Sequence, residues 1–168
     1  MRKAMSIVAV GAIALGALVA AAGQQAKPAS GFEQLKTLVG EWQAKAPSGE
    51  MFTSTIRLVS NDTALEETFQ GAKHDQMVSL YHPDGNRVAM THYCAAGNQP
   101  RMETAATTAD QKEFDFSFQG ITNLPSPDSG HMHHLVIRIA DNDHFSEEWT
   151  WRENGEEQAH RFELTRKK

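Results

Sequence analysis

From residue 40 to the C-terminus, apolar and polar side chains alternate along the chain in ten short runs. Alternation with a period of two is typical of strands that bury one face. Short links rich in Gly, Asn, Asp and Pro separate nearly all of the runs, and only residues 121–130 form a longer loop. Because links this short bring consecutive strands together as antiparallel neighbours, the chain is predicted to fold as a meander. The runs are residues 40–46, 51–60, 64–70, 76–82, 87–95, 101–108, 113–119, 131–140, 144–153 and 156–165.

A ten-stranded antiparallel meander without crossover helices commonly adopts one of two architectures, a closed barrel or a two-layer sandwich. Closure removes the exposed sheet edges, so we expect an up-and-down barrel. A short amphipathic helix is predicted just before the first strand, from apolar residues with helical spacing between Phe32 and Val39. The sequence therefore predicts one all-β domain over residues 32–168, with a short N-terminal helix.

The first 23 residues have the layout of a secretory signal peptide. Two basic residues precede an apolar stretch over residues 6–22, and small residues follow at the expected cleavage site. The alternative is an uncleaved membrane anchor, but the apolar stretch is short and interrupted by glycine. Cleavage predicts a periplasmic or secreted protein without stable membrane insertion, and residues 24–31 then form a linker.

Charge and cysteine content narrow the possible partners. The formal net charge is −5, and no basic stripe with interleaved aromatic residues is present, which argues against a nucleic-acid partner. The single cysteine, Cys94, cannot form an intramolecular disulfide, so stability must come from packing. Cys94 is buried, paired between chains or functional, and the oligomeric state stays open.

One tight turn sets an expected register between the fourth and fifth strands. The segment His82–Gly85 fits a three-residue loop with a left-handed glycine. This loop would pair His82 with Asn86 and Leu80 with Val88, so that His82 and Leu80 face inward.

A second turn sets the register of the last two strands. Asn154-Gly155 fits a two-residue type I′ hairpin turn. This turn would pair Trp149 with His160 and Phe145 with Leu164, which brings large side chains together on the inner face.

Polar side chains also fall on the inner faces of the predicted strands. A solid core would not tolerate so many of them, because each costs about 1–3 kcal/mol unless it is hydrogen-bonded. A barrel of eight or more strands leaves interior room, where water or a ligand can satisfy such groups. The excess therefore predicts a cavity. The inward-facing polar residues are Glu67, His82, His92, Cys94, His131, His133, Glu147, Gln158 and His160.

The segment from Leu35 to Trp42 resembles the start of lipocalins, fatty-acid-binding proteins and nitrobindins, the calycin group of up-and-down barrels. It places a short helix before Gly40-Glu41-Trp42, which matches the Gly-x-Trp of those families. The resemblance implies that Trp42 plugs the closed end of a barrel. It also implies that a basic residue of the last strand, Arg161 or Arg166, covers this tryptophan.

The remaining comparisons with known families do not indicate an activity. The disulfides of lipocalins are absent, because the chain has one cysteine. The haem-ligating histidine region of nitrobindins has no assignable counterpart, so the resemblance leaves the cofactor unknown. Residues 92–102 look like a segment that recurs in uncharacterised secreted bacterial proteins, and this resemblance implies no activity.

Two pairs of residues have the spacing of metal ligands. His131 and His133 would share one strand face, as would His92 and Cys94. If both pairs faced one point in the barrel, a zinc or copper site would result. The alternative is that the histidines line a wet cavity and bind water, with Cys94 as a buried filler.

Glu147 is the strongest candidate for acid–base chemistry. It lies between Phe145 and Trp149 on an inner face, where burial should raise the pKa of its carboxyl group. His160, across from Trp149, could complete an acid–base pair. The alternative is a structural hydrogen bond, and Glu67 presents a similar case.

The loop after the fifth strand offers amide and guanidinium groups. Asn98, Gln99 and Arg101 could recognise a carboxylate or an amide at a barrel mouth. The alternative is that Gly97-Asn98 only makes the turn.

These observations predict a periplasmic or secreted barrel that binds a small, partly polar molecule in its cavity. One alternative is an enzyme that uses Glu147 and a histidine as acid and base, or a metal- or haem-dependent variant. Another is an interaction module with a filled core. No catalytic or metal residue is assigned. The candidate ligand-binding residues are His92, Cys94, Asn98, Gln99, Arg101, His131, His133, Glu147, Trp149 and His160.

Overall fold

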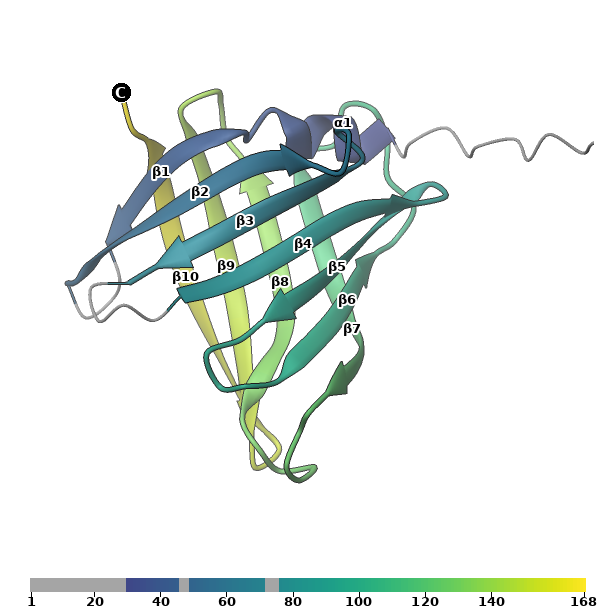
Figure 1. Cartoon of the computed structure of the whole chain (residues 1–168), viewed down its shortest axis with the longest axis vertical. Coiled ribbons are helices and arrows are strands. Elements are labelled where there is room, and N and C mark those ends of the chain that lie inside the picture. Colours follow the sequence, from purple (N-terminus) through teal and green to yellow (C-terminus); the bar gives the residue numbers. More distant parts are fainter. Residues whose placement is uncertain (1–29, 46–48, 72–75) are drawn as a thin grey trace, which may run out of the picture.

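The computed structural model describes residues 30–45, 49–71 and 76–168. Ten antiparallel strands form a closed barrel in which each strand pairs with the next and β1 pairs with β10 (Figure 1). The predicted fold class is confirmed. The predicted signal peptide lies outside the described residues, and the helix begins at Ser30, inside the predicted linker. The elements are α1 (Ser30–Lys36), β1 (Gly40–Lys45), β2 (Met51–Val59), β3 (Ala64–Gln70), β4 (Gln76–Asp84), β5 (Arg87–Tyr93), β6 (Gln99–Thr104), β7 (Glu113–Thr122), β8 (His131–Ile139), β9 (His144–Glu153) and β10 (Glu156–Arg166).

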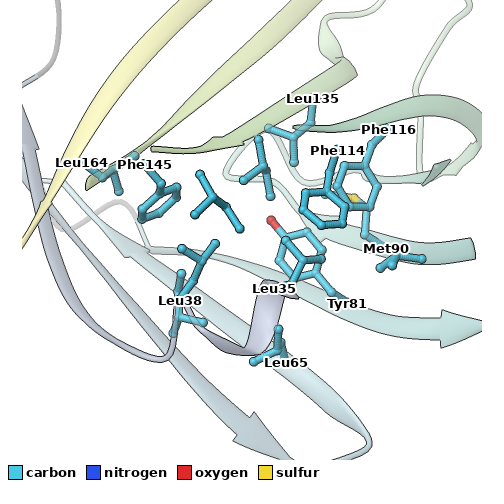
Figure 2. Close-up of a cluster of buried hydrophobic side chains, with 14 of the residues drawn as sticks. Leu35, Leu38, Leu65, Tyr81, Met90, Phe114, Phe116, Leu135, Phe145 and Leu164 are labelled. Atoms are coloured by element: carbon cyan, nitrogen blue, oxygen red, sulfur yellow. The ribbon is translucent and has the colours of Figure 1, made fainter. Parts of the chain in front are cut away.

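The end of the barrel beside α1 is a packed hydrophobic core. Leu35 of α1 and Leu38 just after it lie among buried side chains of the surrounding strands (Figure 2). Phe114 and Phe116 of β7 reach the same cluster, as alternation along that strand requires. The space beside Leu35 and Leu38 in this cluster is only about 10 Å³, which holds at most one water molecule.

Trp42 closes this end of the barrel. Its side chain is fully buried, and its Nε1 donates a hydrogen bond to the carbonyl oxygen of Leu38 over 2.7 Å. Its ring meets Phe145 edge-on, with 4.6 Å between the ring centroids. The guanidinium of Arg166 lies 4.1 Å from the centre of the tryptophan ring, in cation–π contact.

Arg166 also ties three backbone segments together. It donates hydrogen bonds to the carbonyl oxygens of Thr37, Val39 and Asn142. A side chain at Gly40 would collide with the guanidinium, which explains the glycine of the Gly-x-Trp segment. Of the two arginines suggested by resemblance, Arg166 is thus the one that covers Trp42.

The barrel is closed tightly at the α1 end and loosely at the other end. Pairing of β1 with β10 is limited to Trp42 with Arg166 and Gln43 with Thr165. Pairing of β7 with β8 stops at Ser117 and His134. Towards the end away from α1, the described residues of these strand pairs make no further backbone pairs.

The Asn154-Gly155 hairpin has the predicted register. Both residues have positive φ values, 52° and 79°, as a type I′ turn requires. Trp149 pairs with His160, and Phe145 pairs with Leu164, as expected.

The register predicted between β4 and β5 is wrong. The loop has two residues, Gly85 and Asn86, and Tyr81 pairs with Met90. The shift turns Tyr81 into the barrel and leaves His82 exposed, so His82 is not an inward-facing residue.

His131 and His133 lie side by side, as predicted, but the inward direction predicted for them is wrong, because neither lines the cavity. A β-bulge leaves His133 without an opposite residue, between the pairs Met132–Trp151 and His134–Thr150. The extra residue shifts the alternation along β8, so that Met132 faces the interior.

Candidate functional site: an apolar cavity beside a buried polar network

A cavity of about 230 Å³ lies inside the barrel at the end away from α1. By liquid volume it corresponds to about seven or eight water molecules. Its walls are mostly aromatic and thioether side chains from six strands, so it suits an apolar guest. The described lining residues are Glu50, Met51, Phe52, Phe69, Gly71, Met77, His92, Met132, Trp149 and Phe162.

His92 of β5 is the histidine in this lining. Its side chain is 1% exposed, and Ser79 Oγ lies 2.9 Å from its Nδ1. Its ring packs against Trp149, with 4.7 Å between the ring centroids, and more distantly against Phe69. Burial lowers the pKa of His92 to about 4, so the imidazole is neutral at pH 7. Its Nε2 is buried without a hydrogen-bond partner among the described residues.

Two buried carboxyl groups, Glu67 of β3 and Glu147 of β9, lie behind this wall. Ser54 Oγ donates to one oxygen of Glu67 over 2.6 Å, and the Tyr81 hydroxyl donates to the other over 2.9 Å. Trp149 Nε1 donates to Oε2 of Glu147 over 3.0 Å. The Trp149 ring thus forms part of the cavity wall while its N–H faces the acids.

The two carboxyl groups are hydrogen-bonded to each other, which requires a proton on at least one of them. Burial raises the pKa of Glu147 well above its usual range, and the charge of Glu67 raises it further. Burial also raises the pKa of Glu67, while its hydrogen-bond donors lower it. Glu67 has two donors besides Glu147, so its pKa is raised less than that of Glu147, and the proton between the two acids belongs to Glu147. Oε1 of Glu147 meets no other donor among the described residues.

The acid pair is separated from the large cavity. Glu67, Glu147 and Tyr81 border a space of about 10 Å³ under Leu35 and Leu38, which holds at most one water molecule. None of the three lines the larger cavity. A guest in that cavity would therefore contact the acids only through other side chains.

The structure places two of the predicted site residues, His92 and Trp149, in the cavity lining. Glu147 lies directly behind Trp149, and the expected rise in its pKa is present, although its partner is Glu67 instead of a histidine. His160 pairs with Trp149 across the strands but is partly exposed and outside the lining. Cys94 is partly buried just after β5, and burial raises the pKa of its thiol.

The amide and guanidinium groups predicted at the barrel mouth lie outside the cavity lining: Asn98 is in the β5–β6 loop, and Gln99 and Arg101 belong to β6. Asn98 is buried and donates a hydrogen bond from Nδ2 to the carbonyl oxygen of Gly130, which joins two loops. Gln99 accepts hydrogen bonds from Thr122 and Asn123. Arg101 is exposed.

His131 and His133 occupy the gap where β7 and β8 separate. His131 Nδ1 donates to the carbonyl oxygen of Ser129 over 2.9 Å, and its Nε2 lies 3.3 Å from His133 Nδ1. Arg152 Nη1 donates to His133 Nε2 over 3.2 Å, and Phe118 stacks on the His133 ring. The ring nitrogens of both histidines therefore take part in a continuous series of contacts with Ser129, with each other and with Arg152.

The zinc or copper site considered from the sequence is not assembled. Within residues 30–45, 49–71 and 76–168, no group of three or more His, Cys, Asp or Glu residues is placed to hold a metal ion.

Sequence reasoning missed Ser54, Ser79, Tyr81, Met77 and Met132. The wrong β4–β5 register assigned Ser79 and Tyr81 to the outer face. Regular alternation assigned Met132 to the outer face, because the bulge in β8 was not predicted. The signal that could have found Tyr81 is the inward Glu67, because a buried carboxylate needs donors and the chain has only two tyrosines.

No family model matches this sequence, and no curated protein matches it either. In the described part of the chain, no helix has the length and apolar character of a membrane span.

Replacing Glu147 by glutamine tests where the proton between the two acids lies. An amide can donate to Glu67 as the protonated carboxyl does, so Glu147→Gln should stay within about 1 kcal/mol of wild type at about pH 4.5. Above that pH the unfolded chain releases its proton while folded Glu147 keeps it, so wild type loses stability relative to the variant. Urea unfolding at about pH 4.5, 6 and 8 measures the difference.

The exposed Glu156→Gln is the matched control, and its difference from wild type should not change with pH in this way. A Glu147→Gln difference that stays constant from about pH 4.5 to 8 would show that Glu147 carries no proton in the folded chain.

Proposed function

We propose that this chain is a calycin-like barrel, exported to the periplasm or secreted, that binds one small, mainly apolar molecule in the cavity around His92. The observation that carries the proposal is His92, which lines a mainly apolar cavity and whose buried Nε2 has no hydrogen-bond partner among the described residues. Leaving such a group unsatisfied costs about 1–3 kcal/mol, and a bound molecule with a polar atom would remove this cost.

The composition of the cavity supports binding of an organic molecule. Ligand sites are typically concave and apolar with a few placed polar groups, and most occupy roughly 300–1,000 Å³. At about 230 Å³ this cavity is below that range, which favours a small guest. The guest is more apolar than the sequence suggested, because Glu67 and Glu147 bond to each other and to their donors instead of facing it.

Two features support the family and the compartment. Trp42 under Arg166 at the closed end is the arrangement that the calycin resemblance implies. The basic and apolar N-terminal segment supports export. An acid–base enzyme has less support, because neither carboxyl group lines the cavity.

Isothermal titration calorimetry with indole as the probe tests the proposal. We expect binding with a Kd of about 0.1–1 mM, which is reasonable for so small a molecule. Met77→Trp fills the cavity from β4 and should abolish binding. The matched control is Val78→Trp, which changes the next residue on the same strand but leaves the lining intact. No heat of binding with wild type, or equal binding by Met77→Trp, would contradict a guest in this cavity.

A further inference from the structure

A chain of polar contacts connects the cavity wall to the buried Glu67. His92 Nδ1 lies 2.9 Å from Ser79 Oγ, and the Tyr81 hydroxyl lies 2.9 Å from Glu67 Oε2. Ser79 and Tyr81 are neighbours on the inner face of β4, and their side chains are hydrogen-bonded. The chain therefore runs from His92 through Ser79 and Tyr81 to Glu67.

The bond from Tyr81 to Glu67 fixes the direction of every other hydrogen bond in this chain. The Tyr81 hydroxyl donates to Glu67 Oε2, and because a hydroxyl has a single proton, that proton is committed to Glu67. The Tyr81 oxygen then accepts the single proton of Ser79, and the Ser79 oxygen must accept from Nδ1–H of His92. A neutral imidazole has one ring proton, so Nε2 keeps a bare lone pair.

We propose that the cavity selects small apolar molecules that carry one N–H or O–H donor, such as indoles and phenols, because His92 offers them only the lone pair of Nε2. This inference rests on the proposed function and adds the chemical class of the guest. The N–H of Trp149 does not compete, because it is bound to Glu147. The rings of Trp149, Phe69 and Phe52 favour a flat aromatic guest.

Two probes of nearly identical shape test the selection. Indole carries an N–H where benzofuran carries an oxygen, so only indole can donate to Nε2. Titration of the purified chain should show indole binding at least about 10-fold more tightly, since a lost hydrogen bond to a buried acceptor is worth about that ratio. The ¹⁵N resonances of His92 should show a proton on Nδ1.

Substitutions along this series of hydrogen bonds separate the effect of hydrogen-bond direction from the effect of packing. In Glu67→Gln the amide can donate to Tyr81. Every hydrogen bond from Glu67 to His92 can then reverse its direction, which places the ring proton of His92 on Nε2. The preference for indole should then shrink or invert. Tyr81→Phe, which keeps the ring, should also reduce the preference, and it serves if Glu67→Gln does not fold. Ser54→Ala removes a donor to Glu67 outside the chain, so the preference should stay at the wild-type ratio.

The outcomes distinguish this inference from the proposed function. Equal affinities of wild type for indole and benzofuran, or a His92 proton on Nε2, would overturn the selection and leave a binding cavity standing. Failure of both probes to bind would overturn both. If Glu67→Gln and Tyr81→Phe weaken both probes equally, the chain of contacts has only a structural role.

Discussion

Trp42→Ala is expected to lower the free energy of unfolding by about 4 kcal/mol. The substitution empties a large buried site at the closed end, since Trp42 is fully buried and packs against Phe145. It also leaves the guanidinium of Arg166 without its ring and frees the carbonyl oxygen of Leu38. Urea unfolding at neutral pH measures the loss, which corresponds to a fall in Tm of roughly 10–15 °C for a domain of this size.

Two variants identify the cause of that loss. Trp42→Phe keeps an aromatic ring and should lose roughly half as much. Tyr93→Ala removes a large side chain that is 46% exposed on β5 and should cost less than about 1 kcal/mol. If Trp42→Ala costs no more than Tyr93→Ala, Trp42 does not hold the end of the barrel closed.

The architecture could be predicted because pattern and connection length agree. Alternation defines each strand, and short links leave only antiparallel neighbours, so the order of the barrel follows from the chain itself. The Asn154-Gly155 turn could be predicted to the residue, because positive φ at both positions restricts the choice to one turn type.

The β4–β5 register could not be predicted in the same way. A left-handed Gly85 fits both a two-residue and a three-residue loop, so the turn alone does not choose between them. Leu80 and Tyr81 are both large and mainly apolar, so the pattern does not choose either. The register in the structure gives the buried Glu67 a donor from Tyr81, a distant contact that local sequence does not reveal.

The cavity was predicted from an excess of inward polar residues, but of those residues only His92 is in its described lining. Glu67 and Glu147 are hydrogen-bonded to each other, and they also accept hydrogen bonds from Ser54, Tyr81 and Trp149. The hollow part lies beside this network and is apolar. A count of inward polar groups therefore indicates either a wet interior or a closed network, and only the distances between strands far apart in the sequence decide which.

Lowering the pH from about 7 to about 4 is expected to cost the fold roughly 3 kcal/mol through His92 alone. The folded pKa is about 4, against an ordinary value of 6.5. Below pH 6.5 the unfolded chain therefore binds a proton that the folded chain refuses, and stability falls as the pH approaches 4. The raised pKa of Glu147 acts in the opposite direction over acidic pH, so the wild-type profile alone does not isolate His92.

The difference between wild type and His92→Gln isolates this contribution, because the carboxyl pair is present in both proteins. Urea unfolding at about pH 7, 5.5 and 4 should show wild type losing roughly 3 kcal/mol relative to the variant. His82→Gln, which changes an exposed histidine on β4, should show no comparable loss. A guest that donates to Nε2 needs the neutral ring, so indole should bind more weakly toward pH 4 in wild type. A pH-independent gap between wild type and His92→Gln would mean that the folded ring takes up its proton as readily as the unfolded chain does.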